Sequence, residues 1–203
     1  MSVSLASRTP PNARRGAPRF DNRSPKILDA TARLFCLKGY SVTTMRDIAA
    51  ESGMLAGSLY YHFASKEELL VAVYAEGVRR ISESVRAALA RDREPWARLE
   101  GVCAAHLAAL LEDSDYAQVV IRVRPDDAPA VAARLIALRD DYECLFAEAL
   151  NKLPLAHRTD RRSLRLMLLG ALNWSQTWYR SGRDSPEIIA RQFVRLLRHQ
   201  LEP

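Results

Sequence analysis

The sequence predicts an all-α protein of about nine helices, and three observations support this. Ala, Leu and Arg are abundant, whereas only eight glycines occur in 203 residues, and this composition favours helix. Apolar residues recur at helical spacing along most of the chain, with capping signals between the runs. No segment shows the apolar–polar alternation of a strand. The 48% hydrophobic content is ordinary for a folded protein.

Start and stop signals divide the first part of the chain into four helices. Ser24 and Pro25 supply an N-cap and a first helical residue. Thr44-Met45-Arg46-Asp47 and Ser65-Lys66-Glu67-Glu68 both resemble capping boxes. The four helices are therefore expected from Pro25 to Gly39, over 45–52 and 56–63, and from Lys66 onward.

Five further amphipathic helices are expected in the rest of the chain. Proline or glycine breaks separate them, at Pro95, Pro125, Pro154 and Gly182. Their expected ranges are 96–112, 115–124, 128–152, 161–181 and 186–201. The resulting organisation is a disordered basic tail over 1–21, a three-helix domain over 22–68 and a larger helical domain over 69–203.

The charge of the chain is concentrated at one end. Residues 1–66 hold ten basic and four acidic side chains, which accounts for the whole formal charge of +6. This asymmetry indicates an anionic partner for that end. Three cysteines, an odd number set in apolar helical patterns, indicate reduced and mostly buried thiols. Because the chain also shows no membrane span and no secretory signal, we expect a cytoplasmic protein without a membrane partner.

Residues 45–63 have the lengths of a helix-turn-helix, with Gly53 at the turn position that favours a left-handed backbone. In this motif the second helix enters the major groove of double-stranded DNA. Small residues at its start permit close approach to phosphates, and polar or aromatic side chains follow. The candidate contacts of this kind are Ala56, Gly57, Ser58, Tyr60, Tyr61, His62 and the nearby Lys66.

The run from Ile27 to Leu69 strongly resembles the DNA-binding domain of the tetracycline-repressor (TetR) family. The matching residues include Thr43-Thr44-Met45-Arg46-Asp47-Ile48-Ala49 and Gly57-Ser58-Leu59-Tyr60-Tyr61-His62-Phe63. The resemblance implies that Thr44 and Lys66 touch phosphates and that Tyr60 and Tyr61 lie near backbone and bases. Many members have Lys where this chain has Ala56, and Arg46 or the tail arginines are candidates to supply that charge. Packing remains an alternative for either tyrosine, and a solvated position for His62.

No catalytic constellation occurs in residues 67–203. The glycine-rich phosphate loop, the Gly-x-Ser-x-Gly elbow and the His-Glu-x-x-His motif are all missing. Cys103 and His106 have the spacing of metal ligands, but two residues do not make a metal site. We therefore expect neither an enzyme, a cofactor nor a bound metal. The rival interpretation, an all-helical enzyme or adaptor, leaves the match at 57–63 unexplained.

The last two helices are apolar on more than one face, as Leu164–Leu172 and Ile188–Leu197 illustrate. A helix of this kind is buried on two sides. One side would pack on its own domain and the other on a twofold copy, in a four-helix interface. The family resemblance implies the same homodimer, whose two recognition helices would read a near-palindromic operator.

The segment 169–179 is aromatic and carries few charges. With the turn at 54–58, it resembles the branch of the family that regulates fatty-acid and steroid-ring breakdown, whose ligands are often acyl-CoA thioesters. An apolar drug or a free fatty acid is the alternative small-molecule effector. Arg122 and Arg124 would face phosphates of CoA, or else pair with Asp126, Asp127 or Asp141. The candidate ligand-binding residues are Val102, His106, Leu110, Tyr116, Arg122, Arg124, Asn173, Trp174 and Trp178; for the two tryptophans, core or dimer interface is the alternative.

Overall fold

The computed structural model describes residues 24–91, 94–112 and 114–201. Within these ranges the chain forms nine α-helices, two short 3-10 helices and no strand, as the sequence predicts. The predicted tail at 1–21 lies outside the described residues. The helices are α1 (Ser24–Lys38), α2 (Met45–Glu51), α3 (Ala56–His62), α4 (Lys66–Arg91), α5 (Pro95–Leu111), α6 (Asp115–Arg122), α7 (Ala132–Asn151), α8 (Arg161–Trp178) and α9 (Pro186–Leu201), and the 3-10 helices are η1 (Pro125–Asp127) and η2 (Pro129–Val131).

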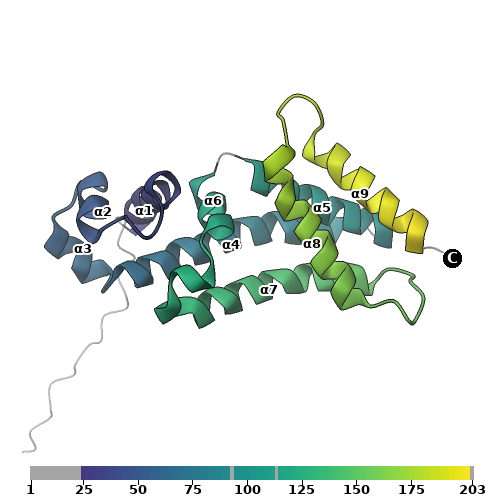
Figure 1. The fold of residues 1–203 in the computed structure, drawn as a ribbon, viewed down its shortest axis with the longest axis horizontal. Helices are drawn as coiled ribbons and strands as arrows, with labels where there is room; N and C mark the ends of the chain where they lie inside the picture. Colours follow the sequence, from purple (N-terminus) through teal and green to yellow (C-terminus); the bar gives the residue numbers. More distant parts are fainter. Residues whose placement is uncertain (1–23, 92–93, 113, 202–203) are drawn as a thin grey trace, which may run out of the picture.

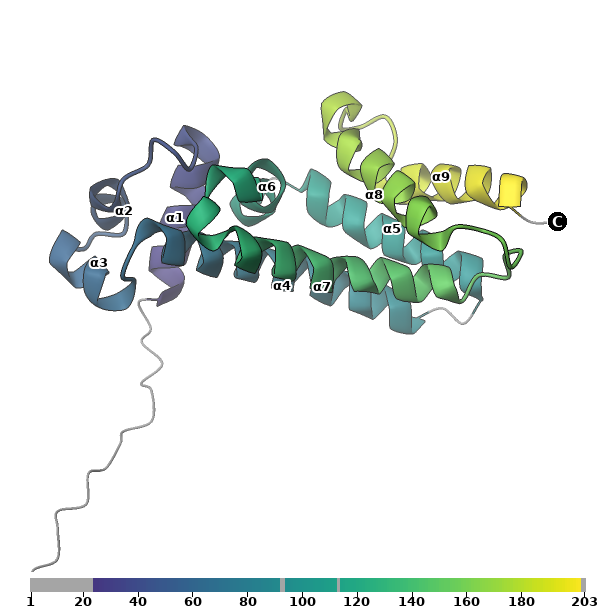
Figure 2. The ribbon, with the colours of Figure 1, turned by 60° about the horizontal axis from the view of Figure 1, so that its bottom comes forward.

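The molecule is elongated, with α1, α2 and α3 at one end and α8 and α9 toward the other (Figure 1). Helix α4 runs from the small end along the molecule, and α7 lies beside it (Figure 2). Helix α5 packs against both α4 and α9. Helix α4 therefore continues across residue 68, where the sequence analysis places the domain boundary.

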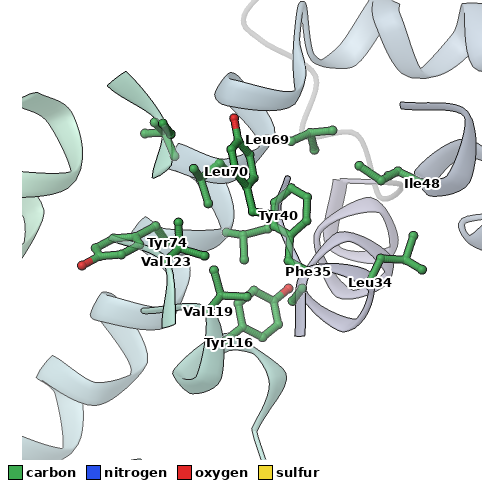
Figure 3. Close-up of a cluster of buried hydrophobic side chains, with 14 of the residues drawn as sticks. Leu34, Phe35, Tyr40, Ile48, Leu69, Leu70, Tyr74, Tyr116, Val119 and Val123 are labelled. Atoms are coloured by element: carbon green, nitrogen blue, oxygen red, sulfur yellow. The ribbon is translucent and has the colours of Figure 1, made fainter. Parts of the chain in front are cut away.

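A first hydrophobic core joins the three-helix unit to the rest of the protein. Phe35 of α1, Tyr74 of α4 and Val119 of α6 are all buried in it. Figure 3 shows these side chains converging from the three helices. Helix α6 thus packs on α1 as well as on α4, so the small unit is held by two elements of the larger one.

A second core lies among α4, α5, α7, α8 and α9. Its largest fully buried side chains include Leu99, Phe146, Leu172 and Ile189. Each comes from a different helix, so no helix pair forms this core alone. The second core fixes the end of the molecule where α8 and α9 lie.

Two predicted helix boundaries are wrong by three or four residues. The helix expected over 128–152 begins at Ala132, because Pro125 and Pro129 start two 3-10 turns before it. The helix expected over 161–181 ends at Trp178, before the turn where Gly182 has a φ of +88°. The other boundaries agree within two residues.

No helix in the described part of the chain is long and apolar enough to cross a membrane. The cysteines only partly match the expectation of buried thiols. Cys103 is buried and Cys36 half-buried, but Cys144 is exposed on α7. Burial raises the pKa of the Cys103 thiol, which therefore stays protonated and packs in the second hydrophobic core.

Candidate nucleic-acid interface and ligand cavity

The turn between α2 and α3 is a tight, fully hydrogen-bonded helix end. Gly53 has a φ of +69°, a conformation that costs least for glycine. The Gly53 amide donates to the Ala50 carbonyl at 3.1 Å, and the Met54 amide donates to the Ala49 carbonyl at 2.8 Å. These are the two bonds of a Schellman motif, and they fix the direction in which α3 leaves α2.

The start of α2 is closed by the predicted capping box. The Asp47 amide donates to the Thr44 hydroxyl at 3.2 Å, and the Thr44 amide donates to the Asp47 carboxylate at 2.9 Å. Hydrogen bonds from Thr44 lower the pKa of the Asp47 carboxyl, with a further contribution from Lys38 at 3.4 Å. Thr44 itself stays exposed, as does its neighbour Arg46.

Helix α3 has one buried and one exposed face. Leu59 is fully buried, while Ala56 and Phe63 pack partly against the first core. The opposite face presents the predicted contact residues to solvent. Gly57, Ser58, Tyr60 and Tyr61 are exposed, and Tyr61 is 89% exposed. Packing inside the protein therefore does not explain why a tyrosine stands at position 61.

His62 and Lys66 are half-buried at the end of this face. The His62 ring meets the edge of Tyr61 with the ring centroids 5.6 Å apart. The Lys66 ammonium donates to the carbonyls of Tyr40 and Ser41 at 2.9 and 3.1 Å, and lies 4.4 Å from the centre of the Tyr40 ring. Lys66 thus fastens the loop before α2 to the start of α4.

The second predicted capping box forms only in part. The Ser65 hydroxyl accepts from the Glu68 amide at 3.3 Å. The Glu68 carboxylate, however, pairs with Arg134 of α7. The neighbouring Glu67 accepts from the Tyr40 hydroxyl at 3.2 Å, and burial together with this carboxylate raises the pKa of Tyr40 to about 12.

A cavity of about 230 Å³ lies in the larger domain. Helices α4, α5, α6, α7 and α8 all contribute to its wall, with Val123, Arg124 and Pro125 following α6. Most of the lining is apolar. The lining residues are Tyr74, Val78, Ile81, His106, Leu110, Val120, Ile121, Val123, Arg124, Pro125, Arg139, Tyr142, Glu143, Leu169 and Asn173.

Four of the nine predicted ligand residues line this cavity, namely His106, Leu110, Arg124 and Asn173. Two others are buried elsewhere: Val102 in the second core, and Tyr116 in the first. The remaining three, Arg122, Trp174 and Trp178, are exposed. The apolar spacing of α5 and α6 predicts buried residues correctly, but does not predict which of them reach the cavity.

Three polar side chains form a chain of hydrogen bonds at the cavity wall. His106 of α5 lies with Nδ1 2.6 Å from the Tyr142 hydroxyl and Nε2 3.1 Å from the Asn173 side-chain oxygen. Burial lowers the pKa of His106 to about 4, although the bond to Asn173 opposes this shift. The imidazole is therefore neutral near pH 7.

Tyr142 lines the cavity but is not among the ligand-binding residues predicted from the sequence. It lies on α7, next to the buried stripe that Phe146 and Leu135 mark. A tyrosine on such a stripe carries a hydroxyl that needs a partner, which is the one signal available in the sequence. Burial raises the pKa of Tyr142, so this hydroxyl keeps its proton.

Arginines surround one carboxylate at the cavity rim. Glu143 lies 3.7 Å from Arg139 and 3.6 Å from Arg165 of α8. The Arg124 side chain is exposed, and within the described ranges its guanidinium has no carboxylate partner. The expected alternative, pairing of Arg124 with Asp127, occurs only through the Arg124 amide, which donates to Asp127 at 2.8 Å.

Two family profiles match this chain. The profile of bacterial regulatory proteins of the tetR family matches residues 27–73. The profile of the tetracyclin repressor-like C-terminal domain matches residues 92–201, more than half of the chain. The chain belongs to the TetR family. Members of this family are DNA-binding regulators of transcription, and not enzymes, so the family resemblance and the expectation of a non-enzyme are confirmed.

Among the relatives of this TetR-family protein is the HTH-type transcriptional repressor KstR2 of Mycobacterium tuberculosis. It is 34% identical over 120 residues, which are 59% of this chain and 58% of KstR2. The match thus spans less than two thirds of the relative. A solved structure of KstR2, described as a ketosteroid transcriptional regulator, has a TM-score of 0.67 at 23% identity and covers 90% of this chain and 95% of that one, which shows a shared fold.

Solved structures of similar shape cover most of this TetR-family chain. AibR in complex with isovaleryl coenzyme A and operator DNA has a TM-score of 0.71 at 27% identity, covering 86% of this chain and 97% of that one. The superantigen PfiT has a TM-score of 0.77 at 29% identity, covering 87% and 96%. One of these proteins was crystallised with operator DNA, whereas the other is called a superantigen, so similarity of shape alone does not assign a function. The assignment rests on the two family profiles.

Proposed function

We propose that this TetR-family protein is a homodimeric repressor that leaves its operator when a short acyl-CoA thioester binds in its cavity. The observation that carries the proposal is the exposed face of α3, which a hydrogen-bonded turn at Gly53 holds in a fixed direction. A recognition helix needs such a fixed direction to enter the major groove. The protein would act on DNA in the cytoplasm.

The proposed DNA contacts divide by chemistry. Ser58, Tyr60 and Tyr61 project from the exposed face of α3 toward bases and backbone, with His62 beside them. Thr44 and Arg46 are exposed at the start of α2. Lys66 uses two donors on backbone carbonyls, and since an ammonium has three, one remains for a phosphate. Because Ala56 is small and Gly57 has no side chain, the backbone at the start of α3 can approach the DNA phosphates closely.

The proposed dimer uses an apolar stripe on α8 and the adjoining face of α9. Large apolar side chains are exposed there although the surrounding helices are well packed. Exposed apolar side chains gathered on two helices are typical of an interaction surface, and a twofold copy would cover them with the same surface. The exposed side chains are Leu166, Met167, Trp174 and Trp178 on α8, and Ile188 and Leu196 on α9.

The proposed effector is a short acyl-CoA thioester. The cavity has about 230 Å³, below the roughly 300–1,000 Å³ of ordinary ligand pockets, so it accommodates a small apolar group and leaves the nucleotide outside. Arg124 and Arg139 at the rim suit its phosphates. The AibR relative, crystallised with isovaleryl coenzyme A and operator DNA, supports the same class. A hydrophobic drug and a free fatty acid are the competing effectors.

The test is a fluorescence-anisotropy titration against the DNA upstream of the protein's own gene. Affinity should fall steeply with salt, because phosphate contacts release counterions. A short acyl-CoA should then release the DNA, whereas free acids and apolar drugs at equal concentration should not. Absence of binding at low salt would remove the regulator proposal, and release by a free acid alone would replace the acyl-CoA.

A further inference from the structure

The hydrogen-bonded chain Tyr142–His106–Asn173 is the main polar feature in an otherwise apolar part of the cavity wall. Its members come from three helices, α7, α5 and α8. Tyr142 and Phe146 also surround the His106 ring, with centroids 5.9 and 5.5 Å away. The imidazole is therefore fixed in position by packing as well as by hydrogen bonds.

The direction of the protons in this chain follows from the acceptors. A neutral imidazole has one N–H and one acceptor nitrogen. The Asn173 side-chain oxygen only accepts, so His106 Nε2 carries the proton and donates to it at 3.1 Å. His106 Nδ1 is then the acceptor, and the Tyr142 hydroxyl donates to it at 2.6 Å. The protonation of each group is therefore defined: the Tyr142 hydroxyl and His106 Nε2 carry protons, and His106 Nδ1 does not.

This arrangement turns the Asn173 amide so that its NH₂ group is not used by His106. The group has two donors, and Asn173, an exposed residue of α8, lines the cavity where it opens to solvent. A pocket that is mostly apolar orients its ligand through a few such polar groups. Donors that are left over at the cavity wall select a ligand with an acceptor oxygen.

We propose that the Asn173 NH₂ group donates a hydrogen bond to the carbonyl oxygen of the effector's acyl group, with His106 and Tyr142 as the positioning residues behind it. This inference rests on the proposed function, because it assumes an acyl thioester in this cavity. It names the effector atom that is recognised, the carbonyl oxygen, and the residue that binds it, Asn173. The apolar remainder of the acyl group lies against Val78, Ile81 and Leu110, which line the same cavity.

The experiment compares two probes on the full chain by calorimetry. Isovaleryl-CoA carries the carbonyl, and S-isopentyl-CoA is the thioether in which a CH₂ group replaces it. The wild type should bind the thioester roughly tenfold more tightly, the effect of one net hydrogen bond. Equal affinity for the two probes, or no binding of either, overturns the inference.

Two variants distinguish the residue that binds the carbonyl oxygen, Asn173, from a residue that positions it, Tyr142. Asn173→Asp keeps the oxygen that accepts from His106 but loses the NH₂ donors, so the preference for the thioester should disappear or reverse. Tyr142→Phe removes the hydroxyl that holds His106, so the ratio of thioester to thioether affinity should fall; a merely structural role would weaken both probes alike and leave this ratio unchanged. The control is Asn151→Asp, the same amide-to-acid change at an exposed side chain at the end of α7 that does not line the cavity. A thioester preference in Asn173→Asp equal to that of the wild type overturns the inference.

The same samples distinguish this inference from the proposed function. A thioester preference that depends on Asn173, without release of operator DNA, would support the inference and contradict the proposal that acyl-CoA releases the repressor from DNA. DNA release by isovaleryl-CoA with no preference over the thioether keeps the repressor and removes the role of Asn173.

Discussion

The hydroxyl of Tyr116 donates a 2.7 Å hydrogen bond to the carboxylate of Asp29, across 87 positions of the sequence. The bond joins α6 of the larger domain to α1 of the DNA-binding unit. The guanidinium of Arg80 lies 4.1 Å from the centre of the Tyr116 ring and so adds α4 to the contact. Because Val120 and Ile121 of α6 also line the cavity, one short helix touches both the proposed effector and the DNA-reading unit.

Replacing Tyr116 by Phe removes only the hydroxyl. We expect the free energy of unfolding to fall by about 1 kcal/mol, the net value of one hydrogen bond, and the effector to release DNA less completely. Urea denaturation and the anisotropy assay measure these effects. Full DNA release in Tyr116→Phe at the wild-type effector concentration would show that the Asp29 contact does not transmit the signal.

Gly77 of α4 permits the close crossing of α6. A Cβ atom there would lie 2.7 Å from a Val120 methyl group and 2.9 Å from the Tyr116 carbonyl oxygen. Gly77→Ala should therefore destabilise the protein by about 1–3 kcal/mol through overpacking. In the control Gly57→Ala the new Cβ meets nothing within 4 Å, and helix propensity predicts a gain of up to about 1 kcal/mol. Equal melting temperatures in the two variants would contradict the close crossing.

Tyr61 should contribute to DNA binding and little to folding, because its side chain is 89% exposed. We expect Tyr61→Ala to weaken operator binding roughly tenfold, for the loss of one contact of 1–3 kcal/mol, with an unchanged melting temperature. Leu37→Ala is the control, since Leu37 is also exposed in the same unit but lies on α1. Equal operator affinity in wild type and Tyr61→Ala would move the contact surface elsewhere.

The buried His106 makes stability depend on pH. Its pKa is about 4 in the folded protein, below the value near 6.5 in an unfolded chain. As the pH falls, the unfolded state therefore takes up this proton before the folded state does. The contribution of the neutral His106 to the free energy of unfolding is complete above about pH 6.5 and is lost as the pH falls toward 4. The loss amounts to about 3 kcal/mol for a shift of this size. Denaturation of wild type and His106→Gln at pH 7 and pH 5 should show the larger decrease in the wild type; parallel decreases would contradict it.

The exposed stripe on α8 predicts the oligomeric state. Met167→Lys places a charge in the proposed interface, so the dimer should dissociate at micromolar concentration in sedimentation velocity. Leu37→Lys is the matched control, with an exposed side chain at the opposite end of the molecule. A Met167→Lys protein that remains dimeric would place the interface on another surface.

Local signals predicted the DNA-binding unit well. The turn at Gly53 and the capping box at Thr44 depend on residues within five positions of each other, so the sequence contains all their partners. The cavity depends on contacts between distant helices. The pattern of α5 shows that Val102 and His106 are both on buried faces, but only the positions of α7 and α8 decide that His106 meets Tyr142 and Asn173. A one-dimensional pattern carries no such information.

Helix α4 is continuous for 26 residues, from Lys66 beside the recognition helix to Arg91 in the larger domain. At 1.5 Å per residue such a rod is about 39 Å long, and tilting it by about 5° moves its far end by roughly 3 Å. Two recognition helices carried on such rods would change their separation by a fraction of a groove width for a very small rotation at the cavity. In the proposed dimer such a helix would amplify a small rotation, so the spacing of the operator half-sites would set how much rotation the DNA complex tolerates.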